Sequence, residues 1–182
     1  AHFSDPLDPP TFEGLKPSDE RARLTQWLRD LMVRQQYEVD MEFGQKTVLT
    51  AVAQVAKQIP HHTVLEDMTH QTLTYRRLLV GVDLLSAQWK TQLERENQHV
   101  GVLLPNVNSM VATLFSLWAS DKVPAVLNYT AGTSTMLICA KLADLSQIIT
   151  SREFFDKFKL EAKPFEEAGI ELIYLEDIRG KI

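Results

Sequence analysis

The sequence predicts an α/β subdomain, a parallel sheet flanked by helices, preceded by a helical linker. From residue 61 onward, short apolar runs alternate with segments of helical periodicity, which is typical of strands that alternate with helices. These runs are apolar at successive positions, so both faces of the sheet should be covered by helices.

The composition is that of a globular protein. Apolar residues make up 45% of the 182 positions, charged residues make up 24%, and the formal net charge is −5, which excludes disorder throughout. The basic residues are scattered, so no nucleic acid is expected as a partner. The single cysteine, Cys139, excludes a disulfide framework. A cytoplasmic setting is expected, because no signal peptide opens the sequence and its most apolar window, 110–119, is too short to span a bilayer.

Two segments are predicted along the chain: residues 1–59 as an extended lead and helical linker, and residues 60–182 as the α/β subdomain. Prolines keep the lead, residues 1–17, out of a helix. The lead contains Pro6, Pro9, Pro10 and Pro17. Ser18 should cap a helix that Gly44 ends, and a second helix should end at Pro60.

The elements of the second segment follow from periodicity. A strand pair is predicted at 64–66 and 72–74 around a polar turn. Four further strands are predicted at 100–104, 123–127, 147–150 and 170–175. Helices are predicted at 75–89, around 110–118, at 133–143 and at 151–158. Four parallel strands joined by right-handed helical crossovers account for this order.

Nucleotide-binding loops are absent from the sequence. Neither the glycine pattern of dinucleotide-binding folds nor a P-loop occurs. The nearest candidate is the small, hydroxyl-rich turn 130–135, whose backbone N–H groups could bind an anion. The favoured interpretation is that Thr133 or a neighbour only caps the next helix.

His62 and Asp67 form a His-x4-Asp pair, which is the acid/base pattern of glycerolipid acyltransferases. About 0.3 such matches are expected by chance in this composition, so the catalytic hypothesis is disfavoured. A metal site built from His61, His62 and His70 lacks suitable spacing.

Other candidates have structural interpretations. Cys139 is expected to be a small buried side chain, because no basic partner is close in the sequence. A group of three aromatic residues is expected in the core. They are Phe154, Phe155 and Phe158. The acidic pair 176–177 ends a strand, where α/β sheets bind ligands, but a solvated loop is favoured. Asn128 also follows a strand, and could bind a ligand or a neighbouring loop.

Residues 72–179 resemble the start of adenylate-forming enzymes, the acyl-CoA synthetase (AMP-binding) superfamily. The segment 73–78 (LTYRRL) is similar to that family's opening element, although Arg77 stands where glutamate is usual, and 100–106 (VGVLLPN) is similar to its first core strand and turn. The segment 123–132 (VPAVLNYTAG), with ITSR and YLED further on, resembles one subgroup. That subgroup is the bifunctional acyl-[acyl-carrier-protein] synthetase / 2-acylglycerophosphoethanolamine acyltransferases.

The first segment agrees with this resemblance. Residues 9–11, 13–15 and the charged helix from Asp19 are similar to the tail that follows the acyltransferase domain. The resemblance implies that the whole protein uses ATP and Mg²⁺ to convert a fatty acid to an acyl-adenylate and loads acyl carrier protein. It also implies acyl transfer to a lysophospholipid at the inner face of the cell membrane.

The family's phosphate loop, magnesium motif, ribose-binding aspartate and catalytic lysine do not occur in this sequence and are expected after Ile182. The chain is therefore interpreted as a fragment that is inactive alone, holds no cofactor, and has the remainder of the synthetase domain as its partner. Strand-end residues should lie nearest the substrate cleft. They are Asn128, Tyr129, Thr130 and Gly132.

Two alternatives stay open. One is a stand-alone interaction module, in which the helical lead binds a partner or a membrane surface and the α/β part is a scaffold. The other is a small enzyme that uses His62 and Asp67. The fragment hypothesis differs from both because it requires an unpaired sheet edge or apolar patch where the missing part docks.

Overall fold

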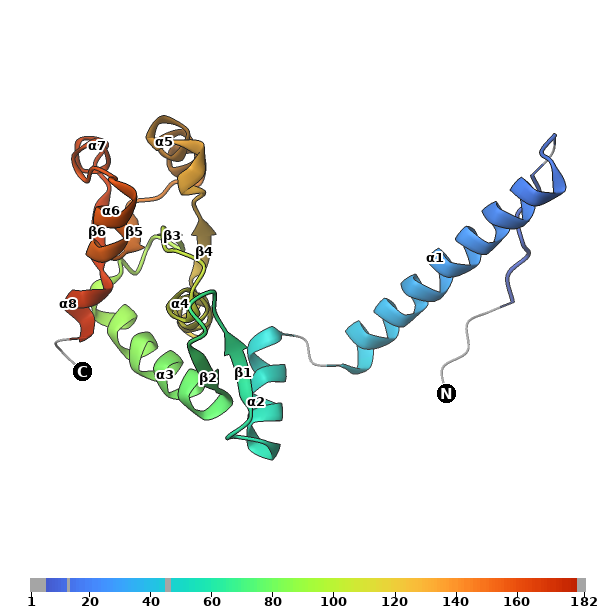
Figure 1. Cartoon of the computed structure of the whole chain (residues 1–182), viewed down its shortest axis with the longest axis horizontal. Helices are drawn as coiled ribbons and strands as arrows, with labels where there is room; N and C mark the ends of the chain where they lie inside the picture. Colours follow the sequence, from blue (N-terminus) through green and yellow to red (C-terminus); the bar gives the residue numbers. More distant parts are fainter. Residues whose placement is uncertain (1–5, 13, 45–46, 180–182) are drawn as a thin grey trace. The chain divides into compact units, whose positions relative to one another are not determined.

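The computed structural model describes residues 6–12, 14–44 and 47–179 (Figure 1). The chain divides into two compact units, residues 1–51 and residues 52–182. The boundary falls inside helix α2 (Val48–Gln58). The assignment of 1–59 and 60–182 to different parts of a larger enzyme stays a prediction.

The first unit consists mainly of the helix α1 (Pro17–Phe43). Its N-cap is Lys16 and Pro17 is its first residue, so the prediction that Ser18 caps the helix is wrong; a proline at this position already has the backbone angle that a helix needs. Gly44 ends the helix, as predicted, and its N–H bonds back to the Asp40 carbonyl at 2.8 Å.

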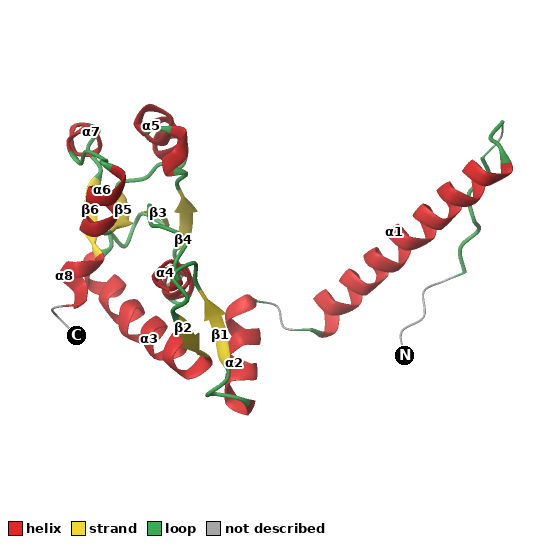
Figure 2. Cartoon of the chain, in the orientation of Figure 1, coloured by secondary structure: helices red, strands yellow, loops and turns green. Residues whose placement is uncertain are grey.

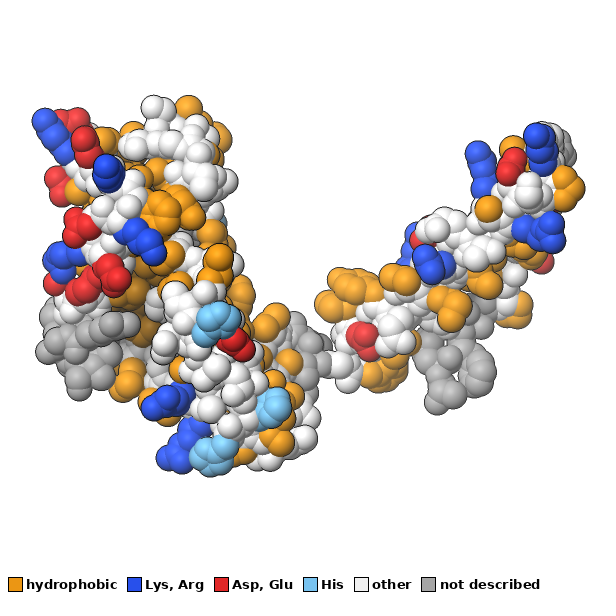
Figure 3. All heavy atoms as spheres, in the orientation of Figure 1, with side chains coloured by type: hydrophobic (Ala, Val, Ile, Leu, Met, Phe, Trp, Pro, Cys, Tyr) orange, Lys and Arg blue, Asp and Glu red, His pale blue; other side chains and the backbone are white. Residues whose placement is uncertain are grey.

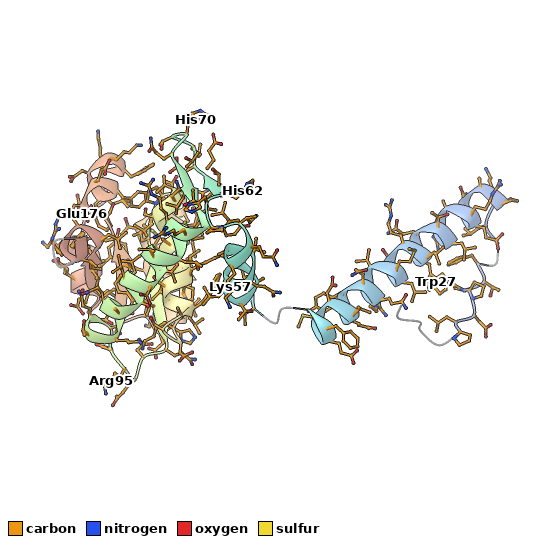
Figure 4. The ribbon with its side chains drawn as sticks, turned by 90° about the horizontal axis from the view of Figure 1, so that it is seen from below. Trp27, Lys57, His62, His70, Arg95 and Glu176 are labelled. Atoms are coloured by element: carbon orange, nitrogen blue, oxygen red, sulfur yellow. The ribbon has the colours of Figure 1, made fainter. Side chains whose placement is uncertain are left out.

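The extended lead has no helix or strand within residues 6–12, as predicted; residues 1–5 and Glu13 lie outside the described residues. Phe12 lies beneath the Arg23 guanidinium, 5.9 Å from its carbon to the ring centre. Trp27 points to the side of α1 along which the lead runs (Figure 4). No side chain of α1 is buried, although the predicted apolar stripe is present.

The second unit opens with the end of α2 and a hairpin. Strands β1 (Thr63–Glu66) and β2 (Thr72–Thr74) pair antiparallel in a sheet of their own, which confirms both predicted strands. The turn between them includes His70, whose φ of 58° is left-handed.

The main sheet has four parallel strands in the order β4-β3-β5-β6, which confirms the predicted α/β class. The strands are β3 (His99–Val102), β4 (Val123–Val126), β5 (Gln147–Thr150) and β6 (Glu171–Tyr174). In the middle of the sheet, Gly101 of β3 pairs with Ala125 on one side and Ile148 on the other.

Helices cover the sheet (Figure 2). They are α3 (Tyr75–Gln92), α4 (Asn108–Trp118), the 3₁₀ turn η1 (Tyr129–Ala131), α5 (Thr133–Leu142), α6 (Arg152–Phe158), α7 (Lys163–Glu167) and α8 (Leu175–Arg179). Sequence periodicity predicts all but η1, α7 and α8, which are too short to show it. No helix in the described residues is long and apolar enough to cross a bilayer.

Two hydrophobic clusters occupy the two faces of the sheet. Val100 and Val102 pack with residues of α3 and α4, whereas Leu103 packs with residues of α5, α6 and α7. Successive strand residues point to opposite faces, so Ile148 and Ile149 are both fully buried, one in each cluster. The sheet is therefore the middle layer of three.

Three predictions about burial need correction. Strand β4 lies at the sheet edge, so Val123 and Val126 are 42% and 54% exposed instead of covered. Cys139 is exposed on α5, because the buried positions of that helix are Met136 and Ala140. Among the three predicted core phenylalanines, only Phe158 is exposed, at the last position of α6.

A buried hydrogen bond joins the two helices on one face. The Trp89 indole N–H of α3 donates to the Ser116 hydroxyl of α4 at 2.7 Å, and that hydroxyl donates to the Thr113 carbonyl at 2.8 Å. Such a bond contributes about 0.5–1.5 kcal/mol and fixes how the helices pack.

We expect the substitution Gly101→Ala to lower the free energy of unfolding by roughly 1–3 kcal/mol. A Cβ at this position would stand 2.5 Å from Ile148 Cγ1 and 3.1 Å from Leu145 Cδ1 in the packed core. The matched control is Gly81→Ala in α3, where nothing lies within 4 Å. That change should stabilise the helix by about 0.5–1 kcal/mol. Urea unfolding of both variants measures the difference, and an equal midpoint for the two would contradict the predicted packing.

Candidate functional site

The sheet order creates a crevice between β3 and β5. From β3 the chain runs through α4 to β4 on one side, whereas from β5 it runs through α6 and α7 to β6 on the other. The loops that leave the two strands therefore diverge. In open parallel sheets, ligands bind outside the carboxyl ends of strands at such a reversal.

A cavity of about 190 Å³ occupies this position. It is lined by residues of the hairpin turn, of the loop after β3, of the first turn of α4, of α6 and its N-cap, and of the start of α8. They are Thr69, Pro105, Val107, Ser109, Ser151, Glu153, Phe154, Lys157, Leu175 and Glu176. We call it the switch-point crevice.

Asp67 holds the hairpin turn at the crevice. Its Oδ1 accepts hydrogen bonds from the N–H and hydroxyl of Thr69, at 2.9 and 2.6 Å, and from the Gln71 N–H at 3.2 Å. Its Oδ2 accepts the N–H of Asn108, the first residue of α4, at 3.3 Å. The Asn108 side-chain amide N–H in turn donates a hydrogen bond to the Gln71 carbonyl at 2.7 Å. The hairpin turn and α4 are thereby fixed together.

The hydrogen bond from the Thr69 hydroxyl is the largest of several that hold the pKa of Asp67 below its ordinary value. These donors come from Thr69, Gln71 and Asn108 and engage both oxygens, so the carboxylate acts as a clamp. His62 is exposed and contributes none of them. This arrangement gives no support to the acid/base hypothesis for His62 and Asp67.

The start of α6 forms the opposite wall. Ser151 caps the helix, as predicted, by accepting the Phe154 N–H at 3.1 Å. Glu176 Oε1 accepts the N–H of Arg152 at 3.0 Å. Glu176 Oε2 is buried and has no hydrogen-bond partner among the described residues. The chain's own carboxylate therefore occupies the first turn of this helix.

The prediction of a solvated loop at residues 176–177 is wrong. Both residues lie in α8, and Asp177 forms a two-pronged ion pair with Arg152, at 2.7 and 2.6 Å. The Arg152 guanidinium also stacks on the Tyr174 ring, 4.3 Å from its centre. The Asp177 carboxylate raises the pKa of Arg152, and burial raises the pKa of Tyr174. These contacts join α6 to the end of β6 beside the crevice.

The residues predicted to lie nearest the cleft follow β4 at the same edge of the sheet, outside the lining of the crevice. Asn128 accepts hydrogen bonds from the N–H and hydroxyl of Thr130, at 3.0 and 2.8 Å. The Tyr129 ring packs on Phe154, which lines the crevice, at 5.2 Å between centres. Tyr129 therefore packs against a residue of the crevice wall without lining the crevice itself. Contact of these residues with a substrate stays a prediction.

Gly132, with a φ of 82°, is the N-cap of α5, and no side chain caps that helix. Of the predicted alternatives, Thr133 or a neighbour, the neighbour Gly132 is the N-cap, and Thr133 is the first residue of the helix. The left-handed backbone at this position favours glycine over any residue with a side chain.

The crevice lining suits binding more than catalysis. It offers three hydroxyls, the Lys157 ammonium and the carboxylates of Glu153 and Glu176, with no histidine or cysteine among them. Among the described residues, none of these hydroxyls is hydrogen-bonded to the carboxylate of Glu153 or Glu176. Across the described residues, no group of three acidic, histidine or cysteine side chains could hold a metal ion. Its volume is below the roughly 300–1,000 Å³ of small-molecule pockets, so it can form only part of a nucleotide site.

A larger hollow of about 590 Å³ lies at the other end of the sheet. It includes Lys90, Arg95 and Lys122, near the amino ends of β3 and β4. The Lys122 ammonium already donates to the carbonyls of Glu94 and Asn97, at 2.5 and 2.6 Å. The hollow is on the wrong side of the sheet for a switch-point ligand.

No sequence pattern indicated that Thr69, Ser109 and Lys157 would lie in a crevice. A polar residue near a strand end is a usable signal, but it does not show which strand ends are neighbours. The adjacency of β3 and β5 decides which residues meet, and it is a property of the tertiary fold.

No family model matches the sequence. Solved structures match the fold: o-succinylbenzoate CoA synthetase (MenE) from Bacillus subtilis in complex with AMP is 19% identical, with a TM-score of 0.62 over 72% of this chain and 32% of that chain. The same enzyme with the acyl-adenylate OSB-AMP is 20% identical, with a TM-score of 0.60 over 72% and 32%. VinN is 21% identical, with a TM-score of 0.61 over 73% and 34%.

The chain has the fold of one part of these proteins. It spans between 25% and 36% of the length of the similar chains. The likeness confirms the predicted fold class.

We expect the clamp at Asp67 to loosen in acid. Because its pKa is lowered on folding from an ordinary value of 3.8, the carboxylate stabilises the folded hairpin above that value and the stabilisation is lost as the pH falls through the folded pKa. NMR shifts of the Thr69, Gln71 and Asn108 amides should report this loss. Asp67→Asn should abolish that pH response; an identical response in both proteins would show that another group is responsible.

Proposed function

We propose that this chain is the first α/β subdomain, with a preceding linker, of an enzyme that activates a carboxylic acid with ATP to an acyl-adenylate. The observation that carries the proposal is the switch-point crevice: a ligand crevice too small for a nucleotide, in a fold shared with part of synthetases several times longer. The role of this subdomain is to supply one wall of the cleft. The groups that would neutralise the phosphates are not among its residues.

We further propose that the acid is a fatty acid and that the acyl group passes to acyl carrier protein. An acyltransferase part of the same protein would then transfer it to 2-acylglycerophosphoethanolamine at the inner face of the membrane. Supporting this are the segment 123–132 and the ITSR and YLED segments, which resemble that subgroup. ATP and Mg²⁺ would bind where the remainder of the synthetase domain completes the cleft.

The exposed edge of the sheet is where the remainder would pack. Strand β4 has no neighbour beyond it among the described residues. Near it, α5 exposes Ile138 and Leu142 at 60% and 83%, and Val126 is half-exposed on the strand itself. An open sheet edge beside exposed apolar side chains is the surface that the fragment hypothesis requires.

The second candidate is an interaction module without catalysis. It is favoured by α1, a helix of 27 residues that buries no side chain and exposes apolar ones such as Met32 and Tyr37. Such a helix is a surface for a partner. The two candidates differ in what lies beyond this sequence in its natural reading frame.

Fatty-acid-dependent exchange of pyrophosphate into ATP tests the enzymatic proposal. We expect exchange from the chain extended to the stop codon of its natural reading frame, and none from residues 1–182 alone. No exchange with any fatty acid, or a stop codon close to Ile182, would refute the proposal and leave the interaction module.

We expect the isolated chain to self-associate through the exposed edge, because no described strand of the second unit pairs with the outer side of β4. Sedimentation velocity should show concentration-dependent association that the double substitution Val126→Lys and Leu142→Lys weakens at least tenfold. The control is Met68→Lys, which adds one positive charge, half of that added by the double variant, to an exposed apolar residue on the hairpin turn. A chain that stays monomeric at all concentrations, or equal effects of the two variants, would contradict an apolar docking edge.

A further inference from the structure

A second hollow, of about 410 Å³, lies where the hairpin leads into α3, at the opposite end of the hairpin from the crevice. Its lining residues are His61, Thr74, Arg76, Arg77 and Val80. Lys57 and His62 lie on the same side of the second unit, away from Glu176 (Figure 4). We call it the arginine hollow.

The cations of this hollow lack acidic partners. Arg76 and Arg77 are exposed, and no ion pair to either guanidinium occurs among the described residues. The nearest acids along the hairpin are engaged elsewhere: Glu66 pairs with His70 at 3.0 Å, and Asp67 forms the clamp. Figure 3 shows Lys, Arg and His side chains gathered over this end of the unit, with acidic atoms beside only one histidine.

Backbone hydrogen bonds hold the hollow together. The Arg76 N–H donates to the Pro60 carbonyl at 2.9 Å, and the Tyr75 N–H donates to the His62 carbonyl at 3.2 Å. These bonds fix the loop that carries His61 against the first turn of α3. The two arginines and the histidine therefore face one space without the cost of ordering a loop.

Arg76 and Arg77 are adjacent in the sequence and line the same hollow. Like charges at adjacent positions repel, and a bound anion removes that repulsion. A guanidinium presents a planar fork of N–H donors that fits two oxygens of a phosphate group, and Thr74 adds a hydroxyl. The concave lining and the apolar wall at Val80 favour a discrete phosphate-bearing group over a broad acidic surface.

We propose that the arginine hollow binds a phosphate monoester group, with Arg76 and Arg77 as its principal ligands. The site is separate from the switch-point crevice and does not depend on the proposed adenylate chemistry. The same chemistry is offered by a free phosphorylated molecule and by the headgroup of phosphatidic acid.

The test is a titration of the 182-residue chain with inorganic phosphate at low ionic strength, followed by amide NMR. Saturable shifts are expected at residues 61–62 and 74–77. The double variant Arg76→Gln and Arg77→Gln should bind at least tenfold more weakly. Because both side chains are exposed, it should unfold at the same urea midpoint. The matched control Lys90→Gln and Arg95→Gln removes two charges from the larger hollow and should leave the affinity unchanged.

Vesicles distinguish the two sources of the phosphate. Binding to phosphatidylcholine vesicles that contain phosphatidic acid, lost in the arginine variant, would assign the group to a lipid headgroup. Phosphate binding without vesicle binding would assign it to a free molecule. Absence of binding in both experiments, or equal binding by wild type and the arginine variant, would overturn the proposal.

Discussion

The pairing of β3 with β5 is the constraint on which the rest of the second unit depends. These strands are neighbours although β4 and two helices separate them in the chain. Their close approach requires a residue without a side chain, because a Cβ at Gly101 would collide with Ile148. Once the strands are paired, the connections from β3 and β5 must diverge, and their loops must open a crevice at the carboxyl edge of the sheet. The two cores, on the two faces, follow from the alternation of side chains along the same strands.

Around that crevice, the chain uses its own carboxylates to complete the structure. Asp67 ties the hairpin to α4, and Glu176 fills the first turn of α6. Arg152 is held between Asp177 and Tyr174, which fixes α6 to the end of β6. The carboxylates of Asp67, Glu176 and Asp177 are thus engaged in contacts that stabilise the fold. What remains toward the crevice is a set of hydroxyls, the Lys157 ammonium, the Glu153 carboxylate and several apolar side chains, all of which can contact a ligand. This is the expected character of one wall of a site that other segments complete.

Most of the fold could be predicted from the sequence, because periodicity and capping act locally. The six strands, the helices longer than five residues, and the helix ends at Gly44 and before Pro60 followed from such signals. What could not be predicted depends on strand order. The half-exposed face of β4 follows from its position at the edge, and the exposure of Cys139 follows from which face of α5 meets the sheet. Likewise, the ion pair between Arg152 and Asp177 joins residues 25 positions apart, so no local sequence pattern predicts it.

The proposal that the switch-point crevice forms one wall of an acyl-adenylate cleft can be tested by hydrogen exchange. The experiment uses the protein encoded by the whole natural reading frame, with and without a non-hydrolysable acyl-adenylate analogue. We expect the analogue to slow amide exchange at residues 103–109 and 150–157 and to leave the larger hollow, at residues 89–98 and 120–122, unchanged. Slower exchange confined to that larger hollow, or no change anywhere in residues 60–179, would contradict it.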